Sequence, residues 1–121
     1  FEYSVDVTAG AATEDFGIPD DQGWLEKLTV SVDGTMDSGT VVTVSFVHPH
    51  GVVEQLTTDT GNADFAVVPR SPIHNNAGVA IADLYTKFAV PKTIRVVVAS
   101  GVATVAGGVV VNAVYSKDRT A

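Results

Sequence analysis

The amino-acid sequence predicts an all-β fold, an antiparallel β-sandwich of seven to eight strands with one long irregular excursion. The 121 residues contain 23 Val and 13 Thr but only 4 Leu and 4 Ile. Side chains branched at Cβ are stiff, and they fit the pleated surface of a sheet better than a helix. Short runs of alternating apolar and polar residues recur between turns rich in Gly and Pro, a spacing typical of sandwiches. Jelly-roll and immunoglobulin-like connections both fit this pattern.

Length and composition indicate a single domain over residues 1–121. A chain of this size buries a core without crosslinks, and its 45% hydrophobic content argues against disorder. Cysteine is absent, which excludes a disulfide scaffold and thiolate metal sites. No apolar run approaches the ~20 residues that cross a bilayer. We therefore expect no membrane partner.

The first half of the chain contains the most regular strand signals. Residues 1–8 alternate apolar and polar side chains, which predicts an edge or arm strand with one solvated face. Residues 9–23 have the small and polar composition of a loop, with room for a short strand near 16–18. Residues 28–32 and 42–46 alternate on either side of a Gly-containing turn, which predicts a hairpin. Further strand signals lie at 52–57 and 65–68.

Residues 70–92 interrupt this pattern and form the irregular excursion. Ala80, Leu84 and Phe88 stand at helical spacing, which predicts one or two turns of helix. After Pro91 the strand signal returns.

Residues 93–100 and 109–116 are near-continuous apolar runs joined by a Gly-rich connection. Such runs are expected for central strands that are covered on both faces or lie at a subunit contact. The last residues, 117–121, are polar and predict a frayed tail.

Two histidines and a carboxylate form the one constellation with metal-binding spacing. Residues two apart on a strand point to the same side, so His48 and His50 would face one metal with Glu54 nearby. This spacing resembles the first motif of the cupin family, which are metal-binding jelly rolls, and residues 69–74 resemble a degraded second motif. The resemblance implies a ligand set of His48, His50, Glu54 and His74. Only 14 residues separate Glu54 from Pro69, too few for the hairpin that cupins place there, so we expect loop histidines and no metal or cofactor.

No residue is predicted to be catalytic. The sequence has no Cys nucleophile, no Gly-x-Ser-x-Gly elbow and no Gly-rich phosphate loop ahead of a helix. The aromatic residues leave an alternative open, because they would suit a sugar-stacking platform in a carbohydrate-binding or tail/fibre adhesion module. A lone Trp more often anchors the core or its rim. The platform residues are Trp24, Tyr3, Tyr85 and Tyr115.

The charges are unevenly distributed along the chain. Nine of the 14 acidic residues lie within 1–37, whereas five of the seven basic residues lie within 83–121. This pattern fits ordinary charged surfaces that face water. It also fits copies that associate head to tail, with the acidic end of one copy against the basic end of its neighbour. The net charge of −7 makes nucleic acid a poor partner.

The order of elements in the C-terminal half resembles tailed-bacteriophage capsid decoration or cement proteins, also called head auxiliary proteins. The resemblance covers roughly residues 24–116 and rests on Phe-Ala-Val-Val-Pro at 65–69, Phe-Ala-Val-Pro at 88–91, the strand run at 93–98 and the run at 109–115. It implies a non-enzymatic virion protein on the capsid exterior, assembled in the host cytoplasm. The implied partners are the major capsid protein and neighbouring copies in a homo-oligomer. Residues expected at such an interface are Phe1, Tyr3, Val5, His48, His50, Ile73, Leu84, Tyr85 and Phe88.

Overall fold

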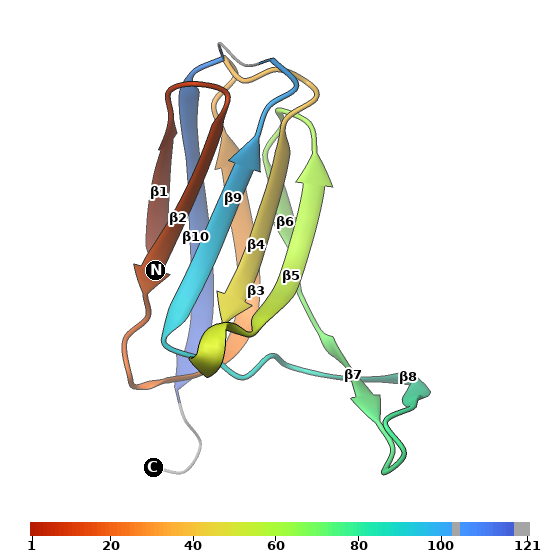
Figure 1. The fold of residues 1–121 in the computed structure, drawn as a ribbon. Coiled ribbons are helices and arrows are strands. Elements are labelled where there is room, and N and C mark those ends of the chain that lie inside the picture. Colours follow the sequence, from red (N-terminus) through yellow and green to blue (C-terminus); the bar gives the residue numbers. More distant parts are fainter. Residues whose placement is uncertain (103–104, 118–121) are drawn as a thin grey trace.

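The computed structural model describes residues 1–102 and 105–117, in which two four-stranded antiparallel sheets pack face to face (Figure 1). The elements are β1 (Glu2–Val7), β2 (Ala11–Gly17), β3 (Gln22–Val32), β4 (Val41–Val47), the 3₁₀ turn η1 (Pro49–Gly51), β5 (Val53–Thr60), β6 (Phe65–Val67), β7 (Ser71–His74), β8 (Ala80–Thr86), β9 (Thr93–Ala99) and β10 (Gly107–Lys117). No helix in these ranges has the length and apolar character that a membrane span requires. The predicted all-β sandwich is confirmed.

The strand order identifies the sandwich as a jelly roll. The first sheet has the order β1-β10-β3-β6 and the second β2-β9-β4-β5. Within the sandwich, the first strand therefore pairs with the last, the second with the next to last, and so on inward to β4 and β5. This nesting of antiparallel pairs across two sheets defines the jelly-roll topology. Of the two connection patterns that the sequence allowed, the immunoglobulin-like one is not the one formed.

The hairpin predicted from residues 28–32 and 42–46 is wrong. β3 pairs with β10 and β6, whereas β4 pairs with β9 and β5 in the opposite sheet. The connection arches over the end of the sandwich, where Met36 is buried. Two strands that each have one apolar face can lie in opposite sheets and pack those faces against each other. They can also lie next to each other in one sheet, with both apolar faces against the other sheet. The alternation of residues does not distinguish the two arrangements.

Residues 9–23 form more structure than their loop-like composition predicts. β2 pairs with β9 along its whole length, from Ala11 opposite Ala99 to Gly17 opposite Thr93. Most of its side chains are exposed, because it is the edge strand of the second sheet. An edge strand with polar side chains on both faces shows little of the period-2 hydrophobic signal on which strand prediction depends.

The strands predicted at 93–100 and 109–116 do lie at the centre, one in each sheet, as β9 and β10. Of the two alternatives predicted for them, coverage on both faces within one chain is wrong, because only one face of each strand is buried; the subunit contact stays a prediction. Val109, Val111 and Ala113 point into the core, while Val114 on the outer face is 50% exposed. The edge position predicted for residues 1–8 is confirmed by β1. Of the predicted tail, Lys117 closes β10 and 118–121 lie outside the described residues.

The core lies between the two sheets and is built mainly from valine. Each of the four inner strands places alternate residues in it, including Leu28, Val44, Val96 and Val111, all 0% exposed. Close packing at one end explains a glycine: a Cβ at Gly107 would lie 2.7 Å from Thr35 Oγ1 and 3.0 Å from Met36 Sδ. Glycine at the start of β10 therefore allows the β3–β4 connection to cap the core.

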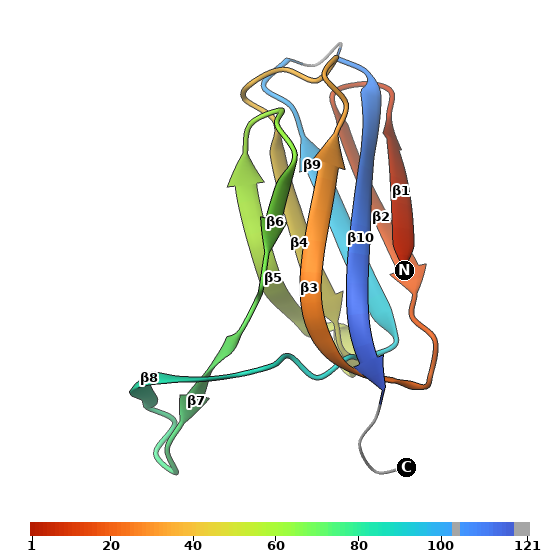
Figure 2. The same cartoon turned by 180° about the vertical axis from the view of Figure 1, so that it is seen from behind.

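The excursion of residues 70–92 contains a β-hairpin and not a helix. β7 and β8 pair with each other, with an irregularity between Pro72 and His74. We call residues 71–86 the arm, because they project from the sandwich beyond the β5 and β6 side (Figures 1 and 2). The prediction of a helix, which rested on the helical spacing of Ala80, Leu84 and Phe88, is wrong. Only Phe88 of the three is buried. The other two sit on an exposed strand.

Three acidic residues from the first part of the chain form ion pairs with basic residues from its last part. Asp15 binds Arg95 through two hydrogen bonds of 2.7 and 3.1 Å, Glu26 lies 2.6 Å from Lys87, and Asp21 lies 3.7 Å from Lys117. Jelly-roll nesting places the first strands beside the last, so an acidic start and a basic end meet inside the same molecule. Three of the nine acidic residues within 1–37 are therefore paired inside one molecule, and head-to-tail contact between copies stays a prediction.

Acid should destabilise the fold through carboxylates whose pKa is lowered. The Arg95 side chain lowers the pKa of Asp15 by donating hydrogen bonds, and Thr35 does the same for Asp33. Partial burial raises the pKa of Asp37, but hydrogen bonds from Thr40, Gly39 and Gly101 outweigh it and lower the pKa. Groups with a lowered folded-state pKa stabilise the protein above the unfolded pKa, and this stability is lost as the pH falls through the folded pKa. The carboxyls concerned are Asp15, Asp21, Glu26, Asp33 and Asp37.

Urea midpoints measured from pH 7 to pH 2 check this prediction. We expect a plateau down to about pH 5 and a steady loss below about pH 4, where these carboxylates take up protons. Asp37→Asn should flatten the acid limb, because Asn does not titrate. A midpoint that is constant to pH 2 would contradict the assignment.

Candidate functional site

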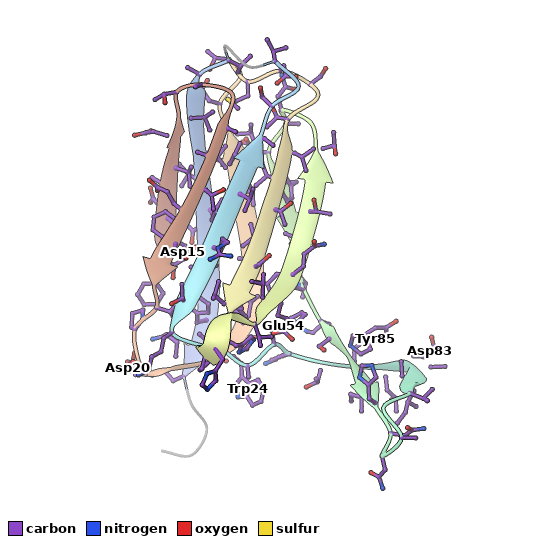
Figure 3. All side chains as sticks on the ribbon, in the orientation of Figure 1. Asp15, Asp20, Trp24, Glu54, Asp83 and Tyr85 are labelled. Carbon is purple, nitrogen blue, oxygen red and sulfur yellow. The ribbon has the colours of Figure 1, made fainter. Side chains whose placement is uncertain are left out.

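The arm exposes apolar side chains over its whole length. Every residue of β8 is exposed, whereas a strand of a sandwich normally buries one face. Four large hydrophobic residues are exposed there, namely Val79 (59%), Ile81 (39%), Leu84 (48%) and Tyr85 (61%). Figure 3 shows Tyr85 and Asp83 on the arm, away from the body of the sandwich. The arm therefore presents the densest group of exposed apolar side chains among the described residues.

The tip of the arm is held by a structured turn. The Asn75 side chain accepts hydrogen bonds from the backbone N–H groups of Ala77 (2.9 Å) and Val79 (3.1 Å). Gly78 has a φ of 78°, a conformation that glycine adopts without steric cost. In the middle of β8, Asp83 also has a positive φ of 61°, which is uncommon for a residue with a side chain and bends the strand. The arm is thus a shaped hairpin rather than a slack loop.

Two cations clamp the base of the arm to β3, one just before the arm and one just after it. Arg70 precedes β7, and its Nη1 donates to the carbonyl oxygens of Pro69 (2.7 Å), Glu26 (3.3 Å) and Leu25 (3.5 Å). Lys87 follows β8, and its Nζ donates to Glu26 Oε1 at 2.6 Å. Beyond Lys87 the chain runs antiparallel to β3, with Leu25 N donating to the Phe88 carbonyl at 3.0 Å. These contacts fix the direction in which the arm projects.

Loss of the Arg70 clamp should let the arm swing. The absence of cysteine allows two spin labels to be attached at engineered sites, Gln55→Cys on β5 and Asn76→Cys at the arm tip. We expect Arg70→Ala to broaden the distribution of distances between the labels, because the two contacts of Arg70 with carbonyl oxygens of β3 are lost. Arg95→Ala, which removes a guanidinium on the second sheet, should leave the width unchanged. If the distance distribution is equally wide in Arg70→Ala and in the unaltered protein, the contacts of Arg70 do not orient the arm.

A cleft lies in the angle between the arm and the outer face of the first sheet. Its volume is about 680 Å³, and it is lined by Trp24, Glu26, Arg70, Tyr85, Thr86, Lys87, Ser116 and Lys117. Trp24 and Glu26 flank the buried Leu25 on β3, so they point away from the core. Ser116 on β10 is the cross-strand partner of Trp24. Sheet residues thus form the floor of the cleft, and the base of the arm forms one wall.

The proposed metal ligands do not come together. His48 Nε2 lies 2.9 Å from Glu54 Oε1, but His50 sits in η1 with a φ of 67°, outside the extended strand that would align the two rings. His74 lies on the arm, at the end of β7. In residues 1–102 and 105–117, no three His, Cys, Asp or Glu side chains are grouped closely enough to hold a metal ion. The ligand set that the cupin resemblance implied is therefore not formed.

The predicted interface residues divide into exposed and buried groups. Tyr3 (6% exposed), Val5 (1%) and Phe88 (8%) belong to the core, so these three predictions are wrong for side-chain contacts. Phe1, His50, Leu84 and Tyr85 are exposed, while His48 and Ile73 are partly buried. Sequence reasoning did not single out Val79 or Ile81, because an exposed apolar residue in an irregular segment gives no periodic signal. The small residues and asparagines around Val79 and Ile81 were the signal in the sequence that this segment forms a projecting turn.

The four-residue aromatic platform is also not assembled. The hydroxyl groups of Tyr3 and Tyr115 lie 3.0 Å apart, and Phe1 packs on Tyr115 with ring centroids 5.6 Å apart. These rings fasten β1 to β10. Trp24 and Tyr85 line the cleft instead, at the places labelled in Figure 3.

No protein-family model matches this chain, and no curated protein matches it.

Proposed function

We propose that this chain is a non-enzymatic structural protein of a virion, a decoration or cement subunit on the outside of the capsid. In this role it binds the major capsid protein and neighbouring copies of itself, and so stabilises the shell. The observation that carries the proposal is the arm, an exposed apolar hairpin held at a fixed angle to a compact sandwich.

The exposure of the arm favours a binding role. An isolated two-stranded hairpin is only marginally stable in water, and contiguous exposed apolar patches typically mark interaction sites. Val79, Ile81, Leu84 and Tyr85 have no covering layer within the described part of the chain. A partner surface that covers them would stabilise the arm and the complex together.

The sandwich suits the role of a scaffold. The jelly roll is an architecture common in viral capsid and lectin domains, and this one keeps its centre filled with fully buried side chains. The contacts of Arg70 and Lys87 with β3 hold the arm in a fixed orientation relative to the sandwich. A small arm buries a modest area, but many copies on one shell convert weak contacts into stable decoration.

The thermal stability of particles tests this function. Virions prepared without the protein should release their genome at a lower temperature or lower ionic strength than complete virions. Adding back the purified protein should restore the original temperature. Particles whose release temperature is unchanged by its removal would refute the proposal.

A further inference from the structure

We propose that the cleft under the arm is a binding site for an acidic saccharide, a ligand of a different class from the capsid, although the two sites share Tyr85. Its volume of about 680 Å³ falls within the range of small-molecule sites. The site is open on the solvent side and is assembled from β3, β10, the end of β8, and the two residues that flank the arm, Arg70 and Lys87.

The aromatic residues supply the saccharide contact. Trp24 lies outside the buried core and is only partly covered by its neighbours, and Tyr85 is 61% exposed. The two residues come from different elements and line the same cleft. Aromatic rings carry a large apolar face together with a polar edge, which matches a pyranose ring that has C–H groups on its faces and hydroxyls at its rim.

The charged residues select an acidic ligand. Arg70, Lys87 and Lys117 line the cleft, which gathers three of the seven cations of the chain into one place. They face two carboxylates, Glu26 in the cleft and Asp21, which lies 3.7 Å from Lys117. Three positive charges against two negative ones leave an excess of one in a chain whose net charge is −7. A carboxylate on the ligand would complement this excess.

The arrangement also provides hydrogen-bonding groups for hydroxyls. Arg70 uses Nη1 for its contacts with the backbone, while a guanidinium has five N–H donors in total. Glu26 accepts from Lys87 and still offers lone pairs, and Ser116 and Thr86 contribute hydroxyls to the lining. Specific sites for polar ligands combine an apolar surface with a few such fixed polar groups.

Trp24 is the only tryptophan of the chain, so intrinsic tryptophan fluorescence reports on this cleft alone. We would titrate the full chain with a galacturonate hexamer, maltohexaose and a glutamate hexapeptide. The expected result is a saturable change in emission with the galacturonate hexamer, at least about tenfold tighter than with either of the others. Raising the salt concentration should weaken the binding, since charge pairs at an open site are screened.

Matched variants assign the response to the cleft. Tyr85→Ala should weaken binding of the galacturonate hexamer about tenfold, and Lys117→Gln, at a side chain 80% exposed, should weaken it less. Phe1→Ala removes an exposed aromatic ring outside the cleft and should leave binding unchanged. No response to the hexamer overturns the proposal, as do equal responses to maltohexaose or the glutamate peptide. None of these outcomes bears on the thermal stability of particles, which tests the arm separately.

Discussion

Removing the arm should abolish attachment to the capsid while leaving the sandwich folded. Ser71 and Thr86 are paired directly across the hairpin, so residues 72–85 can be replaced by Asn-Gly, a two-residue link that closes such a pair. The clamps of Arg70 and Lys87 lie outside the excised segment. Interfaces depend on a few apolar and aromatic anchors, and the arm carries four of them. We expect affinity for particles that lack the protein to fall more than about 100-fold.

Sedimentation of the purified protein with such particles measures this loss. A second variant keeps the hairpin but changes Val79, Ile81, Leu84 and Tyr85 to Ser, and it should lose attachment to a similar degree. Both variants should unfold in urea at nearly the midpoint of the unaltered protein, because the arm contributes nothing to the core. Full retention of either variant on particles would place the contact elsewhere on the molecule.

Truncation of Phe46 should produce the largest loss of stability among single substitutions. The side chain is 0% exposed and is among the largest that are fully buried, on a strand that pairs on both sides with β5 and β9. Removing a buried aromatic ring costs about 3–5 kcal/mol in transfer and cavity energy. Because domains are stable by only about 5–15 kcal/mol, Phe46→Ala should lose about a fifth or more of the free energy of unfolding.

Urea denaturation measures the loss in the free energy of unfolding, and two further variants serve as comparisons. Phe46→Leu fills most of the space, so we expect it to lose less than half as much. Val53→Ala removes methyl groups from a side chain that is 49% exposed, and it should cost less than about 1 kcal/mol. A loss below about 1 kcal/mol for Phe46→Ala would show that the core does not depend on its second sheet as described.

The sequence was sufficient to predict the class of fold and the two central strands. The valine-rich runs at 93–100 and 109–116 form β9 and β10, each of which has a strand on both sides and buries alternate residues in the core. Pairing was harder to predict. The strands at 28–32 and 42–46 are neighbours in sequence but lie in opposite sheets, and the information that separates them is the partner of each strand, which lies far along the chain.

The candidate site was predicted only in part. Leu84 and Tyr85 were expected at an interface and are exposed on the arm, but their segment was expected to be irregular or helical. Tyr3 and Val5 were expected at the same interface and are buried, because an alternating edge strand presents its apolar side to whichever layer covers it. The cleft unites Trp24 with Lys117 and Tyr85, residues separated by up to 93 positions, so no local pattern could reveal it.

Hydrogen exchange of the arm, free and on the capsid, tests the central claim most directly. In the free protein the backbone amides of residues 79–86 should exchange rapidly, since the strand is exposed and has a single partner. On the particle the same amides should be strongly protected, while those of β9 and β10 remain slow in both states. Rapid exchange in the arm of particle-bound protein would contradict the assignment of the arm as the capsid-binding surface.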